Sequence, residues 1–227
     1  MNFLKNKTVL ITGGTGTFGK EAAKFILKNI KVKKLIILSR DENKQYEMSK
    51  DYLNNKNIRF FIGDVRDKNR LMTAFNNVDY VFHAAAMKHV PASEYNPIEC
   101  IKTNVDGSES LISAAIERKV NKVIALSTDK ACNPINLYGA TKLCSEKLFI
   151  NANQYSNHTK FSVVRYGNVI GSRGSVIPFF YSLLNQKKIL PVTSREMTRF
   201  FIPIADAIKF VINSLKIQMG EKFLSQK

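Results

Sequence analysis

Hydrophobic positions along the chain fall into short runs separated by longer segments of mixed pattern. Six apolar runs rich in β-branched residues predict buried parallel strands at 7–12, 35–38, 58–62, 78–82, 122–126 and 161–165. Between them lie helical patterns, including the apolar face of Phe18, Ala22 and Ile26 and a long helix expected from Asn96 to about Lys119. Because strand and helix patterns alternate without repeats, the sequence predicts an α/β fold with a doubly wound parallel sheet.

A glycine-rich turn joins the first predicted strand to the first predicted helix. Gly13 allows a tight turn, Gly16 lets the backbone approach a pyrophosphate, and Gly19 lets helix and strand pack closely. The amides at the start of the helix then face the anion. A glycine-rich turn without a ligand is the alternative. The pattern favours a Rossmann-like cofactor domain over residues 1–165, with three further contacts in the turn from Thr15, Thr17 and Phe18.

The end of the second predicted strand bears on the choice of dinucleotide. Ser39 and Arg40 stand there, and Asp41 follows. An acidic residue at this point binds the ribose hydroxyls of NAD, whereas an arginine accommodates the 2′-phosphate of NADP. The sequence therefore favours NADP, with Lys44 nearby to assist. The alternative is that Arg40 only caps the sheet edge while Asp41 caps the next helix.

Residues after the third and fourth strands complete the predicted cofactor site. Asp64 is placed to bind the adenine amino group, and Val65 to cover the ring. The small side chains of Ala84 and Ala85 leave space for the cofactor, and the loop that carries Lys88 reaches toward a substrate.

Three polar residues in this part of the chain have competing interpretations. Asn104 lies within the expected long helix, either on an exposed polar face or bracing the backbone beside the site. His83 and His89 lack a third ligand at a sensible spacing, so no metal site is expected. His83 is interpreted as a satisfied residue at a strand end.

The chemistry-bearing residues cluster around the fifth predicted strand. Thr128, Asp129 and Lys130 follow that strand, and ligands bind at the carboxyl ends of strands in open α/β sheets. Tyr138 and Lys142 lie four residues apart in the next helix, so they share one face. These five residues are the predicted catalytic group.

Residues 166–227 are predicted to form a small, incomplete C-terminal substrate lobe. Asn168 and Arg173 lie in a glycine-rich loop after the sixth strand, which suggests a loop shaped around a ligand. Arg199 lies between apolar residues and is a candidate for binding a diphosphate, or else an ordinary surface arginine.

The net charge and the cysteine content narrow the possible binding partners and the cellular compartment of the protein. Lys and Arg number 35 against 18 Asp and Glu, a net charge of +17 that suits nucleic acid, a membrane surface or an anionic substrate. The lysines are scattered along the chain, which favours a compositional bias, and no nucleic-acid signature is present. The three isolated cysteines indicate a reducing compartment. Without a leader or a long apolar run, we expect a cytoplasmic protein with no membrane partner.

The glycine turn together with Tyr138-x-x-x-Lys142 resembles the extended short-chain dehydrogenase/reductase superfamily. Residues 82–91 and 127–138 closely resemble the soluble, inverting UDP-N-acetylglucosamine 4,6-dehydratases of bacterial surface-glycan and flagellin-sugar biosynthesis, and the likeness extends from Lys7 to about Gly220. The resemblance implies bound NADP recycled within each turnover, UDP-N-acetylglucosamine as substrate, a homo-oligomer, and a first step toward pseudaminic-acid-type sugars.

The resemblance also implies roles for individual residues. Tyr138 takes the proton of the sugar C4 hydroxyl as hydride leaves C4, Lys130 removes the C5 hydrogen, and Asp129 protonates the departing C6 hydroxyl. A lysine base needs its pKa lowered from about 10.4 by burial or a nearby cation. The cofactor would also contact Lys88, Asn104, Tyr138 and Lys142, and the substrate would contact Lys88, Thr128, Tyr138, Asn168, Arg173 and Arg199.

One residue refines the resemblance, and one departure from the family pattern limits it. Membrane-anchored, retaining relatives have Met where this chain has Tyr138, which favours the inverting class. The family continues beyond the C-terminus of this chain, so NADP binding is the firmer expectation and turnover the weaker. The alternatives are a truncated NADP-binding or subunit-interaction protein with little activity, or a UDP-sugar epimerase, which would need Tyr138 and Lys142 but not the Asp129-Lys130 pair.

Overall fold

A seven-stranded parallel sheet forms the centre of the molecule. The structure is a computed structural model that describes residues 2–192, 194–217 and 223–225. The strand order is β3-β2-β1-β4-β5-β6-β9. All six predicted strands are present, so the predicted α/β, doubly wound class is confirmed. The strands are β1 (Thr8–Thr12), β2 (Lys34–Ser39), β3 (Ile58–Ile62), β4 (Tyr80–His83), β5 (Lys122–Thr128), β6 (Lys160–Tyr166) and β9 (Phe223–Ser225).

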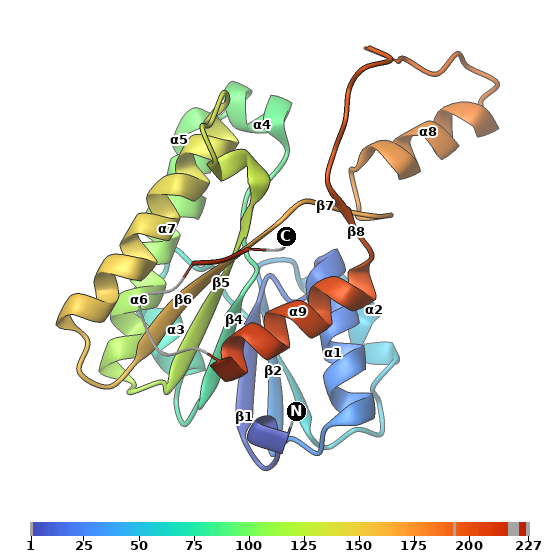
Figure 1. Ribbon diagram of the computed structural model, residues 1–227. Coiled ribbons are helices and arrows are strands. Elements are labelled where there is room, and N and C mark those ends of the chain that lie inside the picture. The colour runs from blue at the N-terminus through green and yellow to red at the C-terminus, as the bar shows by residue number, and fades with distance from the viewer. Residues whose placement is uncertain (1, 193, 218–222, 226–227) are drawn as a thin grey trace.

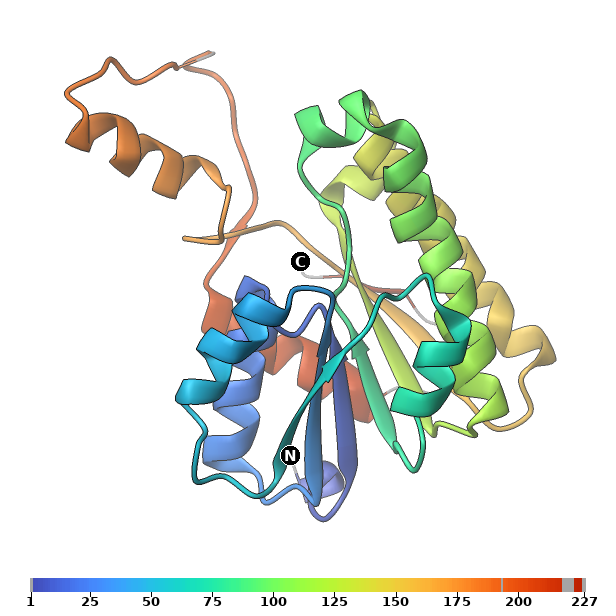
Figure 2. The ribbon, with the colours of Figure 1, turned by 180° about the vertical axis from the view of Figure 1, so that it is seen from behind.

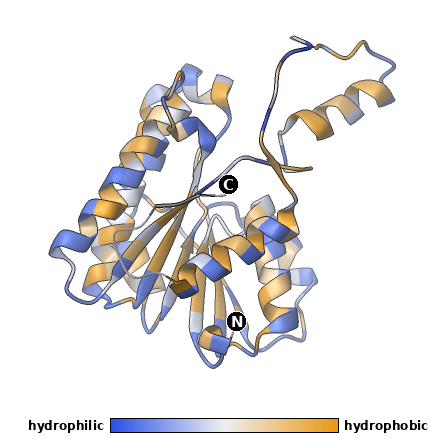
Figure 3. Cartoon of the chain, viewed as in Figure 1, coloured by the Kyte–Doolittle hydropathy of each residue, from blue (hydrophilic) through white to orange (hydrophobic). Residues whose placement is uncertain are grey.

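Helices cover both faces of the sheet (Figures 1 and 2). One apolar core lies between the sheet and α1 (Thr17–Asn29), α2 (Glu42–Lys50) and α9 (Ile204–Ile217). The other core lies between the sheet and α3 (Lys68–Ala74), α6 (Gly107–Glu117) and α7 (Leu137–Tyr155). Every residue of β1 is buried because both of its faces are covered, which explains its unbroken apolar sequence. Figure 3 shows this as hydrophobic strands between helices with hydrophilic outer faces.

The predicted long helix from Asn96 to about Lys119 is wrong in detail. The structure has α4 (Val90–Tyr95), α5 (Pro97–Ile101), a π-helical turn (Lys102–Asp106) and then α6. A π turn holds one more residue than an α turn, and hydrophobic periodicity does not reveal it. The extra residue turns Asn104 inward, where its side chain is 2% exposed.

The segment after β6 leaves the sheet and then returns to it. β7 (Asn168–Val169) pairs with β8 (Phe201–Ile202), and α8 (Val176–Asn185) stands away from the sheet with none of its residues buried (Figure 1). The chain then enters α9, which packs against α1 and the sheet, and β9 pairs with β6. The division at residue 165 stays a prediction, and this packing favours counting α9 and β9 with the sheet. No described helix has the length and apolar character needed to cross a membrane.

The polarity of the sheet decides where a ligand site can form. β1 and β4 are neighbours, and the connections from them run toward opposite ends of the sheet. In such sheets a crevice opens at the carboxyl ends of the strands where the order reverses. The glycine turn after β1 and the polar residues after β4 and β5 all lie at this edge, which we call the carboxyl edge.

We predict that Gly19→Ala destabilises the fold. A Cβ at Gly19 would lie 2.5 Å from Cα and from the carbonyl oxygen of Gly14, so the first turn of α1 would have to shift. We expect the free energy of unfolding to fall by about 1–3 kcal/mol in urea titrations followed by circular dichroism.

Gly16→Ala is the matched control, because its Cβ would come no closer than 3.1 Å to Gly13 O. Helix propensity alone predicts that alanine at position 19 stabilises α1 by about 1 kcal/mol. A Gly19→Ala variant more stable than the parent protein would therefore contradict the close packing.

Candidate active site

The predicted catalytic residues are brought together by a close contact between the start of α7 and the turn that follows β5. Thr128 is the last residue of β5, and a 3₁₀ turn (Asp129–Ala131) follows. Asn136 caps α7 by accepting a hydrogen bond from Gly139 N at 2.8 Å. A Cβ on Gly139 would lie 2.2 Å from Lys130 O, so only glycine lets the helix come this near. This contact sets Tyr138 beside Thr128.

Tyr138 is a half-buried phenol next to a threonine and a carboxylate. Burial raises the pKa of Tyr138 to about 12, a hydrogen bond with Thr128 opposes the shift, and the charge of Asp129 adds to it. The Thr128 hydroxyl also donates to Asp129 Oδ1 at 2.8 Å. Tyr166 of β6 lies close to Tyr138, and burial followed by the charge of Tyr138 raises the pKa of Tyr166 above its usual range. Tyr166 was not among the predicted site residues, and position after a strand was its only signal.

Lys142 lies one turn further along α7 and is 3% exposed. Burial lowers the pKa of Lys142 to about 8, and the Glu146 carboxylate opposes that shift. Glu146 is itself 1% exposed and is held by Arg165 of β6, whose Nε donates to Oε1 at 2.7 Å and whose Nη2 contacts Oε2. Sequence reasoning missed this pair, although the spacing of Lys142 and Glu146, four residues apart in a helix, was a readable signal.

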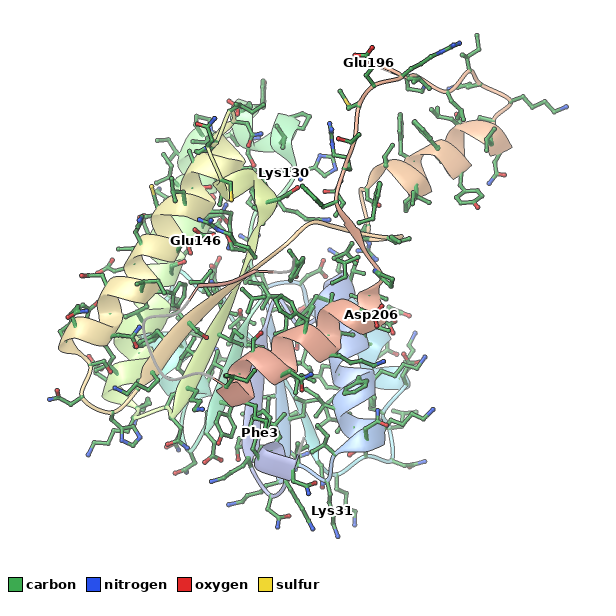
Figure 4. The ribbon with its side chains drawn as sticks, viewed as in Figure 1. Phe3, Lys31, Lys130, Glu146, Glu196 and Asp206 are labelled. Carbon is green, nitrogen blue, oxygen red and sulfur yellow. The ribbon has the colours of Figure 1, made fainter. Side chains whose placement is uncertain are left out.

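Lys130 lies beside Asp129 and Asn168, and the sequence predicted that all three residues belong to one site. Its Nζ donates to Asp129 Oδ1 at 3.1 Å and to Asn168 Oδ1 at 3.0 Å. Asn168 belongs to β7, so the segment after β6 bends back over the end of β5. Figure 4 shows Lys130 at the carboxyl edge, between the sheet and the segment that carries α8.

Lys88 and Arg173 lie on the same side of the site. The Lys88 Nζ donates to Arg173 O at 2.8 Å, and Arg173 N donates to Thr17 Oγ1 at 3.2 Å. Burial and then the positive charge of Lys130 lower the pKa of Lys88. The two ammonium groups therefore lie close enough for the charge of Lys130 to act on Lys88.

The glycine turn forms the floor of a cradle against the end of β4. Gly13 has φ +64°, and a Cβ there would lie 2.7 Å from Ala85 N. The same Cβ would also lie 2.9 Å from the carbonyl carbon of Ala84. Gly13 therefore packs against Ala84 and Ala85, the small residues predicted to border the cofactor. Thr15 and Phe18 are buried in the turn. Such a backbone cradle at a helix start suits a pyrophosphate, so these residues fit a dinucleotide.

His83 is accounted for by its neighbours in the core. Its Nδ1 is 2.8 Å from the Thr12 hydroxyl, which also accepts from Ala85 N at 3.2 Å. Burial lowers the pKa of His83 to about 3, with a further contribution from the charge of Lys142, so the ring is neutral. The interpretation of His83 as a satisfied strand-end residue is confirmed. The described residues contain no group of three side chains able to hold a metal ion.

The end of β2 carries an exposed arginine above a network of polar contacts. Asp41 caps α2 by accepting from Lys44 N at 2.9 Å, and its carboxylate also pairs with Lys44 Nζ. Arg40 Nη1 lies 3.6 Å from Asp64 Oδ2 and is otherwise open to solvent. The Ser39 hydroxyl is buried and accepts from Gln45 Nε2 at 3.0 Å. Arg40 is thus exposed beside the cradle, whereas Lys44 would have to leave Asp41 to bind an anion there.

Asp64 is held in place by an arginine that the sequence did not single out. Arg66 donates to Asp64 Oδ2 through Nε at 3.0 Å and through Nη2 at 2.7 Å. Burial would raise the pKa of Asp64, but Arg66 and then Arg40 hold it below its usual value. The neighbouring Val65 is buried.

Asn104 braces the loop that carries Lys88. Its Oδ1 accepts from Met87 N at 2.8 Å, and its Nδ2 donates to Met87 O at 2.9 Å and to Thr141 Oγ1 at 3.0 Å. The backbone-bracing interpretation is confirmed, and direct contact with a cofactor stays a prediction.

Arg199 is the predicted site residue with the weakest support. It is exposed, and within the described chain its side-chain hydrogen bonds go to its sequence neighbours, Thr198 O at 2.6 Å and Met197 Sδ at 2.9 Å. Its role toward a diphosphate therefore stays a prediction.

We predict that Glu146→Gln lowers the pKa of Lys142 further, below about 8. The variant removes the negative charge that opposes the effect of burial and leaves the charge of Arg165 unbalanced. The pKa is read from an NMR titration of the lysine side-chain signals. Glu146→Asp keeps the charge and should restore most of the parent value. Glu117→Gln, a surface change beside Lys68, should have no effect. An unchanged or raised pKa in Glu146→Gln would refute the coupling.

Comparisons with known proteins agree with this geometry. The chain is 58% identical over 222 residues to a UDP-N-acetylglucosamine 4,6-dehydratase (inverting) of Campylobacter jejuni subsp. jejuni serotype O:23/36 (strain 81-176), covering 96% of this chain and 66% of that protein. It is 50% identical to a UDP-glucose 4-epimerase of Rickettsia bellii (strain OSU 85-389), covering 97% of this chain and 66% of that protein. The chain thus spans just under two thirds of the length of these relatives.

A solved structure and a family model complete the comparison. The X-ray structure of Pen from Bacillus thuringiensis superposes with a TM-score of 0.95 at 42% identity, over 99% of this chain and 72% of that one. The family described as "Polysaccharide biosynthesis protein" matches residues 9–227. Nearly the whole chain, including the glycine turn, the Asp129–Ala131 turn and α7, falls within that match. The chain therefore belongs to the polysaccharide biosynthesis protein family.

Proposed function

We propose that the protein catalyses the NADP-dependent 4,6-dehydration of UDP-N-acetylglucosamine with inversion at C5, as a lyase that forms a UDP-4-keto-6-deoxy-hexosamine. One observation carries the proposal: an amine and a carboxylate, Lys130 and Asp129, lie together at the end of β5, directly beside the Tyr138–Thr128 pair. A simple oxidoreductase needs the tyrosine and the buried lysine. An elimination needs a second base and a second acid, which this pair supplies. The inverting dehydratase relative from Campylobacter jejuni supports the same assignment.

Tyr138 serves the oxidation at C4. When bound, NADP accepts a hydride from C4 of the sugar and later returns it to C6. The Tyr138 oxygen accepts the proton of the C4 hydroxyl, which requires the pKa of the phenol to fall from its high resting value. The hydrogen bond with the Thr128 hydroxyl lowers the pKa of Tyr138 and so favours the phenolate.

Lys130 and Asp129 serve the elimination. The C4 ketone makes the C5 hydrogen acidic, and Lys130 Nζ accepts it as a proton. Asp129 gives a proton to the C6 hydroxyl, which leaves as water, so the electrons of the C5–H bond form the C5–C6 double bond. Asn168 holds Lys130 through its amide oxygen, which accepts from Nζ at 3.0 Å. A proton then returns to C5 from the opposite face, and the centre is inverted.

The remaining assignments follow from the site and the relatives. Residues 1–165 would hold NADP, with Arg40 and Lys44 toward the 2′-phosphate, and Asn168, Arg173 and Arg199 from residues 166–227 would help to hold the UDP-sugar. We propose a cytoplasmic homo-oligomer on a route to pseudaminic-acid-type sugars. Exposed apolar side chains around α4 and α5, among them Tyr95 at 87% and Ile98 at 60% exposure, support association of subunits.

A UDP-sugar 4-epimerase is the second candidate, because a relative bearing an epimerase name is 50% identical. An epimerase would release an isomer of its substrate without loss of water. The Asp129-Lys130 pair would then have no chemical task.

We predict that the product formed from UDP-N-acetylglucosamine in deuterated water has lost water and carries deuterium at C5. Mass spectrometry and NMR give both results. Lys130→Gln should lower turnover by about 10²–10⁴-fold, as expected for loss of a general base, and leave NADP binding intact. Lys102→Gln, at an exposed helical position, is the control.

Two outcomes would count against this proposal. A product that keeps its water, as an isomer, favours the epimerase. NADP binding without UDP-sugar binding or turnover favours the truncated NADP-binding or subunit-interaction protein.

We predict that Arg40→Ala weakens NADP binding about 10- to 100-fold and leaves NAD binding within about threefold. The expected loss is that of one charge-assisted hydrogen bond, about 1.5–3 kcal/mol. Isothermal titration calorimetry with both dinucleotides measures it, and Arg195→Ala, at another exposed arginine, is the control. Tighter binding of NAD than of NADP by the parent protein would overturn the choice of cofactor.

A further inference from the structure

Basic residues gather at the edge of the sheet opposite the catalytic cluster. Parallel strands all begin at this edge, and α1, α2, α6, α7 and α9 all end there. We call it the amino edge and define it as residues 2–7, 28–34, 50–59, 75–80, 117–122, 155–160 and 215–217. In Figure 4, Lys31 marks the amino edge and Lys130 the carboxyl edge, at opposite ends of the sheet.

The amino edge holds most of the net charge of the chain. Fourteen of its residues are basic and three are acidic, an excess of eleven positive charges out of +17. These residues come from seven separate segments, so their gathering is a product of the fold and is invisible in sequence order. The basic residues are Lys5, Lys7, Lys28, Lys31, Lys33, Lys34, Lys50, Lys56, Arg59, Arg118, Lys119, Lys122, Lys160 and Lys216, and the acidic ones are Asp51, Asp79 and Glu117.

The positive charges are exposed and only slightly neutralised. All of the basic residues except Lys7 and Lys122 are exposed. Lys7 pairs with Asp79 at 3.2 Å and Lys50 pairs with Glu47 at 2.8 Å, whereas Glu117 pairs with Lys68, outside the amino edge. Within the described chain, Lys31, Lys33, Lys34 and Lys56 form no ion pair. Lysines often lie at helix C-termini, where they interact favourably with the helix dipole. That explains few of the lysines of the amino edge, because most of them lie in loops or at strand starts.

The side-chain chemistry fits a lipid surface better than a nucleic acid. Nearly all of the cations are lysines, which act as strongly hydrated point charges, whereas nucleic-acid recognition relies on arginine forks. The two arginines of the edge already donate to backbone carbonyls, Arg59 to Ile58 O at 2.7 Å and Arg118 to Met72 O at 2.8 Å.

Large apolar side chains protrude among these lysines. Leu53 is 80% exposed, and Tyr155 and Ile217 are each 58% exposed. Leu53 lies in the connection between α2 and β3, Tyr155 is the last residue of α7 and Ile217 is the last residue of α9, so they are spread along the same edge. Basic residues around exposed apolar and aromatic ones are the combination that binds the interface of an anionic bilayer.

We propose that the amino edge binds the anionic surface of a lipid bilayer peripherally, through its lysines and the protruding Leu53, Tyr155 and Ile217. The carboxyl edge then faces away from the bilayer, so the site stays open to soluble molecules. The sequence alone favoured scattered lysines and no membrane partner. In the fold, however, many of these lysines gather at one edge of the sheet. Binding to the surface of a bilayer does not require a membrane-spanning helix.

The test is co-sedimentation with vesicles of phosphatidylcholine alone or mixed with phosphatidylglycerol. We expect binding only to the mixed vesicles, at about 0.1 M salt, and release at about 1 M salt, where the Debye length is near 3 Å. A variant with Lys31, Lys33, Lys34 and Lys56 all changed to Gln should bind these vesicles at least on the order of 100-fold more weakly. The matched control changes Lys102, Lys147, Lys187 and Lys188 to Gln, which removes the same charge from other exposed surfaces and should bind as the parent does.

Each other outcome overturns the proposal. No binding of the parent to mixed vesicles, equal binding to neutral vesicles, or equal losses in the two variants would do so. Tighter salt-sensitive binding to duplex DNA than to vesicles would assign the edge to nucleic acid instead. Circular dichroism and NADP titration of both variants show that they are folded. Because vesicle binding needs no turnover, it is decided independently of the proposed reaction.

Discussion

The close approach of α7 to the turn after β5 is the constraint on which the site depends. Gly139 lies where any side chain would collide with the carbonyl of Lys130. That contact fixes the distance between a strand end and a helix start, and with it the positions of Thr128, Tyr138 and Lys142. Asp129 and Lys130 of the turn and the phenol of Tyr138 are therefore held together as one group. A larger residue at position 139 would separate the two halves of the chemistry without touching any reacting group.

Burial and pairing divide the lysines of the site into different electrostatic classes. Lys142 is enclosed and has a carboxylate one helical turn away, so the protein both lowers its pKa and limits that lowering. Lys130 is partly open and is shared between a carboxylate and an amide oxygen. Lys88 has its ammonium on a backbone carbonyl and feels the charge of Lys130. The three ammonium groups thus stand in three different environments at one edge of the sheet.

Much of the fold and part of the site could be predicted from local signals. The buried strands, the glycine turn and the Tyr138–Lys142 spacing each depend on a short stretch of sequence. Features created by long-range contacts could not be predicted in this way. The Glu146–Arg165 pair joins a helix to a strand, and Arg66 was overlooked although it is only two residues from Asp64. The π turn that buries Asn104 has no hydrophobic period of its own, and the lysines of the amino edge come from six segments.

The pairing of β7 with β8 has a consequence for how such a protein diversifies. Asn168 and Val169 lie beside Phe201 and Ile202, so the excursion between them starts and ends at one narrow neck. Asn168, which touches Lys130, belongs to the neck, and α8 beyond it contributes nothing to the buried core. Arg173 before α8 still bonds to Lys88 and Thr17, so it is α8 that can change length or composition while the neck keeps Asn168 beside Lys130. A tolerant helix and a fixed contact with Lys130 are thereby separated within one short stretch of chain.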